Sequence, residues 1–296
     1  ITTLTNSYKP EETEATVKKV WEDKNNQDGK RPASLEVVLK ADGVKKTTVT
    51  LNADNDWSAT VKDLPVYDDG NAIVYTWAEN EAGLPEGYEL TDTSINGTVT
   101  TLTNTYKPEE TSATVIKAWA DKDNQDGKRP AELKVVLKGN DKEIKTVTLT
   151  ADTNWTAKVD GLPMYENGKK IDYTWAEDEA GLPEGYELDG STKDGTVTTI
   201  TNKYTPEETE RTVLKVWDDA ENQDGKRPES LSVLLKGTDG SERKVTLSDA
   251  NSWTDTITGL PVYDKGVKIV YTWYEGELPE GYVLSNTEEN GTITTL

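Results

Sequence analysis

The chain contains no cysteine and no histidine among its 296 residues. Without cysteine it can form neither a disulfide nor a thiolate nucleophile, and without histidine it lacks the base of a Ser-His-Asp triad. The usual zinc sites depend on the same two residue types and are excluded as well. We therefore expect no metal site and no cofactor, and any covalent staple must be of another kind.

Cations and long apolar runs are also scarce. The chain has 33 Lys and Arg against 55 Asp and Glu, a net charge of -22, whereas nucleic acids and anionic lipids require clustered basic residues. No apolar run approaches the roughly 20 residues that span a bilayer, and no basic and apolar leader opens the chain. We expect neither nucleic acid nor a membrane as a partner of this fragment. Because it begins at Ile rather than Met, we interpret it as a piece of a longer protein, whose export signal and anchor lie outside it.

One unit occurs three times with a period of 98 residues, which separates Trp21, Trp119 and Trp217. The block NQDGKRP recurs at the same interval, and such a period is too long for a solenoid repeat but suits a whole domain. Residues 1–10 match the end of such a unit and are interpreted as the last-strand remnant of a preceding repeat. The sequence then predicts a first repeat at 11–107, a second at 108–205 and a third at 206–296.

Within a repeat, runs rich in Val, Ile, Thr, Tyr and Trp alternate with Asp-Gly and Asn-Gly turns. This spacing predicts a small all-β sandwich without an amphipathic helix. The connectors at 106–111 and 204–209 are short, acidic and contain proline, so we expect three sandwiches in an elongated, fairly stiff rod. In the first repeat the predicted strands lie near 14–21, 35–41, 44–52, 56–61, 72–79 and 98–106.

A lysine occupies an unexpected position on the first of these strands. Side chains alternate between the two faces of a strand, so Lys19 points the same way as Val17 and Trp21. The lysine recurs as Lys117 and Lys215 in the other repeats. Either a lysine is buried in each repeat or the strand assignment is wrong.

Two further polar residues share apolar strand faces. Glu79 follows apolar residues two, four and six positions earlier, and Asn104 lies between two apolar residues on the inward face of the last strand. The corresponding residues are Glu177 and Asn202 in the second repeat and Glu275 in the third. Each complete repeat is thus predicted to direct one Lys, one Glu and one Asn inward.

These three groups can react with one another when water is excluded. Desolvation lowers the pKa of a lysine and raises that of a glutamate, so that the pair can exist as a neutral amine and a protonated acid. A neutral amine is a nucleophile, and the acid can polarise the asparagine carbonyl and shuttle protons while ammonia leaves. The predicted product is an amide between Lys19 and Asn104. Its closure of a long loop would stabilise the fold by about 4 to 5 kcal/mol.

The motifs K-x-W on the first strand, Y-T-W-x-E, L-P-x-G-Y and T-N-x-Y resemble the Cna protein B-type domain, a tandem repeat of Gram-positive surface adhesins and pilins. The resemblance implies a transthyretin-like (prealbumin-like) β-sandwich, a stalk or spacer role at the cell wall, and an autocatalytic Lys-Asn isopeptide bond assisted by Glu or Asp. Such a protein turns over no external substrate. Matching by position gives Lys19, Glu79 and Asn104 in the first repeat, and Lys117, Glu177 and Asn202 in the second.

The third repeat departs from the pattern. It has Lys215 and Glu275, but the chain stops at residues 293–296, two residues before the expected asparagine, while Asn6 stands without a repeat of its own. We expect no bond within this repeat. One hypothesis is that residues 1–8 of another copy add as the missing strand. The alternative is a truncated end.

The sequence also admits other interpretations. A ligand-binding adhesin module recognising glycan or matrix protein is the main alternative function, and Trp21, Trp57 and Trp77 could form its platform, although their strand positions favour core packing. An enzyme acting on an external substrate would need an open polar pocket. In the simplest alternative to a reactive group of three, the lysine extends its amine to solvent, the glutamate ends a strand and the asparagine lies in a turn with its hydrogen bonds satisfied.

The acidic loop at 121–127 superficially resembles a calcium loop. Aligning its glycine with the sixth loop position places Lys122 first and Leu133 twelfth, where ligating oxygens are required. We interpret it as a plain acidic surface loop, with weak calcium binding as the alternative. No sortase signal and no pilin lysine motif occurs in the sequence.

Overall fold

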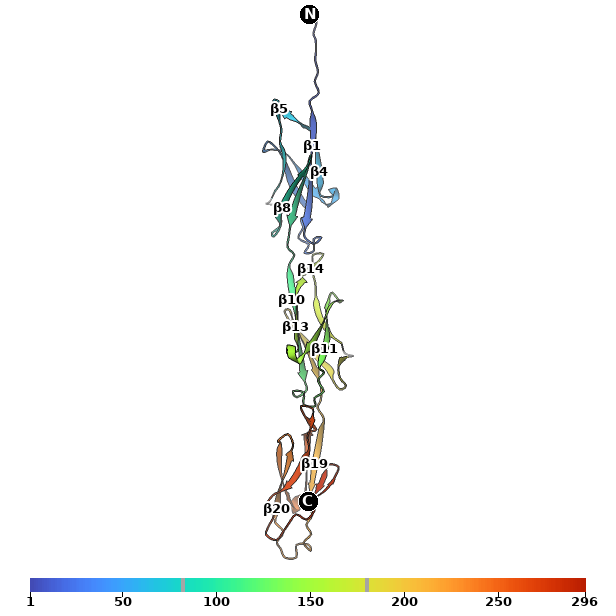
Figure 1. Ribbon diagram of the computed structural model, residues 1–296, viewed down its shortest axis with the longest axis vertical. Helices are drawn as coiled ribbons and strands as arrows, with labels where there is room; N and C mark the ends of the chain where they lie inside the picture. The colour runs from blue at the N-terminus through green and yellow to red at the C-terminus, as the bar shows by residue number, and fades with distance from the viewer. Residues whose placement is uncertain (81–82, 179–180) are drawn as a thin grey trace. The chain divides into compact units, whose positions relative to one another are not determined.

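Figure 1 shows the computed structural model of the chain, which is built from strands and short loops. The structure describes residues 1–80, 83–178 and 181–296. Within these ranges there is no α-helix, only short 3-10 turns, and none of the helical segments is long and apolar enough to cross a membrane. Contacts between Cα atoms divide the chain into two compact units, which are residues 1–113 with 159–173, and residues 114–158 with 174–296.

The first repeat contains two sheets and a small hairpin. A four-stranded sheet has the order β4-β1-β9-β8, a three-stranded sheet has the order β3-β2-β7, and β5 pairs with β6. Strands β1 and β9 run parallel, while the other pairs in this repeat are antiparallel. The strands are β1 (Glu12–Glu22), β2 (Ser34–Ala41), β3 (Val44–Asn52), β4 (Ser58–Pro65), β5 (Tyr67–Asp68), β6 (Asn71–Ala72), β7 (Tyr75–Glu79), β8 (Glu89–Asn96) and β9 (Val99–Thr105).

The core of this repeat lies between the two sheets. Alternate residues of β2, Leu35, Val37 and Leu39, are almost completely buried, and they pack in one cluster with Val17 of β1 and Leu102 of β9. Period-two alternation is what places these residues on a single inward face of each strand. The predicted all-β sandwich is therefore confirmed.

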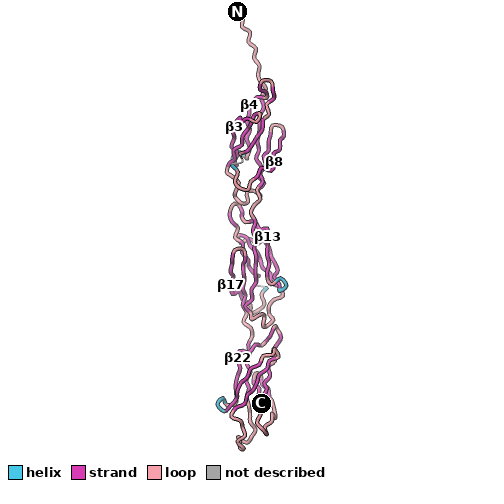
Figure 2. Tube along the Cα trace, turned by 90° about the vertical axis from the view of Figure 1, so that its left-hand side faces the viewer, coloured by secondary structure: helices cyan, strands magenta, loops and turns pink. Residues whose placement is uncertain are grey.

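The same arrangement recurs in the other two repeats, where strand again predominates (Figure 2). The sheet orders are β13-β10-β18-β17 with β12-β11-β16 in the second repeat, and β22-β19-β27-β26 with β21-β20-β25 in the third. The strands are β10 (Glu110–Ala120), β11 (Glu132–Gly139), β12 (Lys142–Thr150), β13 (Thr156–Pro163), β14 (Tyr165–Glu166), β15 (Lys169–Lys170), β16 (Tyr173–Glu177), β17 (Glu187–Asp194), β18 (Val197–Lys203), β19 (Glu208–Leu214), β20 (Ser230–Gly237), β21 (Glu242–Ser248), β22 (Thr254–Pro261), β23 (Tyr263–Asp264), β24 (Val267–Lys268), β25 (Tyr271–Glu275), β26 (Glu288–Asn290) and β27 (Ile293–Thr295).

The structure corrects two of the predicted strands and adds one that was not predicted. Strand β8 was not predicted, because all of its side chains are exposed and its sequence lacks an apolar alternation. The strand predicted at 56–61 begins only at Ser58, since Asp56 and Trp57 have φ of 49° and 52° after a 3-10 turn. The run predicted at 72–79 is divided into the end of β6 and the whole of β7.

Candidate functional site

The three polar residues of the first repeat come from three different strands. Lys19 lies on β1 and Asn104 on the adjacent parallel strand β9, where Lys19 is paired with Leu102 and Trp21 with Asn104. Glu79 ends β7, in the other sheet. The side chains of Lys19 and Glu79 are 0% and 1% exposed, and Asn104 is 0% exposed. The lysine of the first strand is therefore buried, as strand parity predicts.

The lysine amine is in contact with both of its expected partners. Lys19 Nζ donates a hydrogen bond to Asn104 Oδ1 at 2.6 Å and another to the Leu102 carbonyl at 3.0 Å. It lies 3.6 Å from Glu79 Oε2. Asn104 Nδ2 and both Glu79 carboxylate oxygens have no hydrogen-bond partner among the described residues. Buried polar groups without partners cost about 1–3 kcal/mol each, so the unreacted arrangement is energetically unfavourable.

Burial changes the acid-base behaviour of this lysine. Desolvation lowers the pKa of Lys19 to about 8, although the neighbouring Glu79 acts in the opposite direction. The amine also lies 4.6 Å from the centre of the Trp21 ring. The neutral, nucleophilic amine is consequently accessible near physiological pH.

The second repeat brings together the corresponding residues. Lys117 Nζ lies 3.5 Å from Glu177 Oε2, and the two side chains are 0% and 4% exposed. Desolvation lowers the pKa of Lys117 to about 8. The amine donates to the Ile200 carbonyl at 3.2 Å, and Asn202 is fully buried. Neither Asn202 Oδ1 nor Nδ2 has a hydrogen-bond partner in the described part of the chain, so Lys117 and Asn202 lack the hydrogen bond that joins Lys19 to Asn104.

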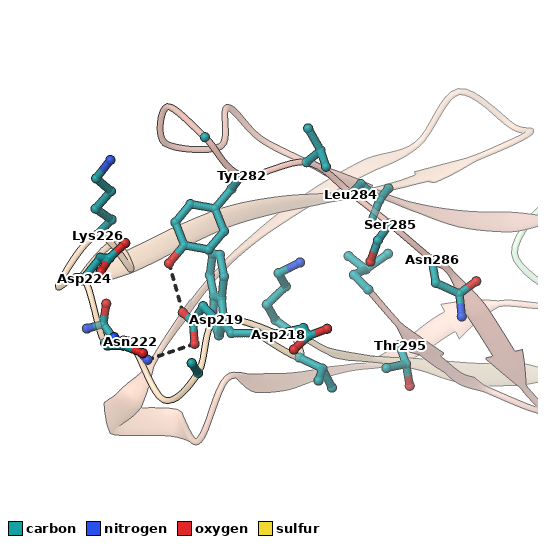
Figure 3. Close-up of a pocket in the computed structure, with 18 of the residues that line it drawn as sticks. Asp218, Asp219, Asn222, Asp224, Lys226, Tyr282, Leu284, Ser285, Asn286 and Thr295 are labelled. Carbon is teal, nitrogen blue, oxygen red and sulfur yellow. Dashed lines mark hydrogen bonds between the residues drawn. The ribbon is translucent and has the colours of Figure 1, made fainter.

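In the third repeat, Lys215 has a glutamate partner but no asparagine. Its Nζ lies 2.7 Å from Glu275 Oε1. A cavity of about 960 Å³ lies beside Lys215. Tyr282 lines this cavity, and the Tyr282 hydroxyl donates a hydrogen bond to Asp219 at 2.9 Å (Figure 3). In the first repeat the equivalent Tyr88 is covered by Tyr106, which stacks on it at 5.0 Å.

Asn6 lies exposed in the irregular residues before β1.

The tryptophans considered as a carbohydrate platform belong to the core. Trp77 is 7% exposed, and Trp21 and Trp57 pack against the same apolar cluster with their rings edge to face at 5.0 Å. Core packing is therefore the correct interpretation of these residues.

The interpretation of the acidic loop as a plain surface loop was wrong. Asp121 and Asp126 are 1% and 7% exposed. Arg129 donates two hydrogen bonds to Asp121, and Asp126 accepts from the Tyr204 hydroxyl at 2.9 Å. No group of three or more potential acidic, His or Cys metal ligands is found in the described ranges. The carboxylates bind donors of their own chain, one of which, Arg129, is only eight residues from Asp121, whereas Tyr204 is 78 residues from Asp126 and could not be recognised from the loop sequence.

Comparisons with known proteins agree with this architecture. The Cna protein B-type domain matches residues 15–105, 113–203 and 211–295. The collagen adhesin of Staphylococcus aureus is 42% identical over 293 residues, which are 99% of this chain and 24% of that protein, so the chain spans about a quarter of its relative. A crystal structure of two B repeat units of the S. aureus collagen binding protein is 42% identical, covering 97% of this chain and 76% of that one, with a TM-score of 0.58.

Proposed function

This chain belongs to the Cna protein B-type domain family, and from that premise we propose that it is a structural stalk segment of a Gram-positive cell-surface adhesin, stabilised by isopeptide bonds that it forms itself. Repeats of this family are structural domains of surface proteins, not enzymes. The proposal places this segment outside the cell, in a protein anchored to the cell wall. It acts on no external substrate, since each repeat reacts once with itself.

The observation that carries the proposal is the contact of Lys19 Nζ with Asn104 Oδ1 at 2.6 Å beside a buried glutamate. The neutral amine attacks Cγ of Asn104, forming a C–N bond. Glu79 in its acid form donates its proton to Oδ1 as the amine attacks, and the resulting carboxylate accepts the proton released by the attacking nitrogen. It then delivers that proton to the leaving amide nitrogen, and the proton on Oδ1 returns to Glu79 as the carbonyl re-forms. Ammonia departs and the carboxyl group ends the reaction as it began. Lys117, Glu177 and Asn202 have the same roles in the second repeat.

The position of the bond suits a stalk. The chain enters the sandwich through β1 and leaves it through β9, and these strands are direct parallel neighbours. A covalent bond between them carries tension from one to the other, so the rest of the sandwich is not pulled apart. Because the link is an amide, reductants that break disulfides leave it intact.

Intact mass is the direct test. We expect the purified chain to weigh less than its formula by two molecules of ammonia, one for each completed repeat. Lys19→Ala combined with Lys117→Ala should abolish both losses, whereas Lys18→Ala, at the exposed neighbouring position on β1, should abolish neither. A parent chain that matches its formula mass would refute the crosslinks and leave only a chain of β-modules.

For the third repeat, we propose that residues 1–8 of a second copy can add as the missing strand and bring Asn6 to Lys215. The proposal rests on the cavity next to Lys215 and on the near identity of residues 1–8 with the last strands of the complete repeats. Light scattering over a concentration series should then show association. Strictly monomeric behaviour at high concentration would rule out strand addition.

A further inference from the structure

We propose that the NQDGKRP loop of the first and of the second repeat is a docking surface for the glycine-tipped turn of the hairpin in the repeat that follows it. In the first repeat this docking loop is residues 26–32, and the docked turn is Asn167–Gly168, between β14 and β15. The proposal concerns the junction between consecutive repeats, and so goes beyond the bonds proposed within them.

The contact lies inside the first compact unit and is made by backbone on both sides. The Gly168 N–H donates to the Gln27 carbonyl at 3.0 Å. A Cβ at Gly29 would lie 2.6 Å from Gly168 Cα, closer than two carbon atoms that are not bonded to each other can approach. Both glycines also have positive φ, +70° and +74°. Two separate reasons therefore favour glycine here, the positive φ of the backbone and the close approach of the two turns.

The second compact unit contains an independent instance of the same contact. The Gly266 N–H donates to the Gln125 carbonyl at 3.1 Å, and a Cβ at Gly127 would lie 2.5 Å from Gly266 Cα. The residue before the docked glycine differs, Asn167 in one turn and Lys265 in the other. The recurring features are thus the glycine, its N–H and the carbonyl that receives it.

The docking loop also holds the linker that leads to the next repeat. Asp28 accepts a hydrogen bond from the Tyr106 hydroxyl at 2.9 Å and one from the Glu109 N–H at 2.7 Å. Lys30 pairs with the Glu109 carboxylate at 2.6 Å. In the second repeat the same bonds join Asp126 to Tyr204 and Glu207, and Lys128 to Glu207. A single loop thus recognises both the acidic linker and the glycine turn, a combination supplied by another repeat of this kind.

The chain offers matched control positions. Gly70 is the corresponding turn glycine of the first repeat, with φ of +82°, and Gly225 is the corresponding loop glycine of the third, with φ of +62°. A Cβ at either position would have no atom within 4 Å. Substitution there reproduces the conformational strain without disturbing a docked contact.

Amide hydrogen exchange, measured by NMR on the full chain, tests the docking surface. In the parent, we expect the N–H groups of Gly168 and Gly266 to exchange more slowly than that of Gly70. Gly29→Ala should accelerate exchange at Gly168 by roughly tenfold or more, because opening of the docked contact becomes easier. Gly127→Ala should do the same at Gly266, whereas Gly225→Ala should change neither.

Two results would overturn the proposal. One is exchange at Gly168 as fast as at Gly70 in the parent chain, and the other is an equal response of Gly168 to Gly29→Ala and Gly225→Ala. Should Gly29→Ala unfold its own repeat, Gly168→Ala serves instead, with Gly70→Ala as its control. Gly168→Ala should shift the amide resonances of residues 27–29, and Gly70→Ala should not. Equal shifts in the two variants would count against docking.

Discussion

Replacing Glu79 by glutamine should slow formation of the Lys19–Asn104 bond by about two to four orders of magnitude, the usual contribution of a general acid-base group. Glutamine preserves the size of the side chain but can neither accept the amine proton nor deliver one to the leaving nitrogen. Lys19 and Asn104 would still meet in the same buried site. Freshly purified Glu79→Gln protein should therefore weigh less than its own formula by one ammonia, where the parent lacks two, and the second ammonia should be lost only slowly during storage.

The second repeat and the surface provide the controls for this experiment. Glu177→Gln should retain one ammonia in the same way, and the double variant should retain two. Glu89→Gln, at an exposed position on β8, should have the mass expected of a fully crosslinked chain. If Glu79→Gln is completely crosslinked when purified, Glu79 is not the proton shuttle.

The meeting of lysine, glutamate and asparagine could be predicted because it depends on two regular features of the sequence. Strand alternation placed Lys19 and Asn104 on inward faces, and burial confirms both. Repetition showed that Lys117 keeps its identity in a second copy of the strand. Period-two patterns of this kind are local, so they can be recognised without knowledge of the tertiary structure.

The docking loop could not be predicted in the same way. Its Asp-Gly pair correctly indicates a turn, but nothing close in the sequence shows that Asp28 binds Tyr106 or that Gly29 lies against Gly168. Strand β8 was missed for a related reason. Its exposed polar side chains carry no alternation, and it is defined by its backbone pairing with β9. Features fixed by long-range backbone contacts leave little trace in local composition.

Loss of the crosslink should have a large effect on stability, and variants at the three positions should differ in a predictable order. Asn104→Ala removes the acceptor but leaves Lys19 beside Glu79, so it should cost the loop-closure contribution of about 4 to 5 kcal/mol for a bond that joins residues 85 apart. Lys19→Ala removes the bond and also leaves the buried Glu79 without its partner. Breaking a buried pair typically costs about 3 to 5 kcal/mol, so Lys19→Ala should be the less stable variant.

A third variant separates the covalent contribution from the electrostatic one. Lys19→Met with Glu79→Leu fills the site with apolar groups of similar size, and such replacements of buried pairs are often neutral. Its stability should therefore return to that of Asn104→Ala, since only the crosslink is missing from both. Urea unfolding followed by NMR signals of the first repeat measures this order, with signals of the second repeat as an internal reference. An unfolding midpoint of Asn104→Ala equal to that of the parent would show that no covalent bond had been lost.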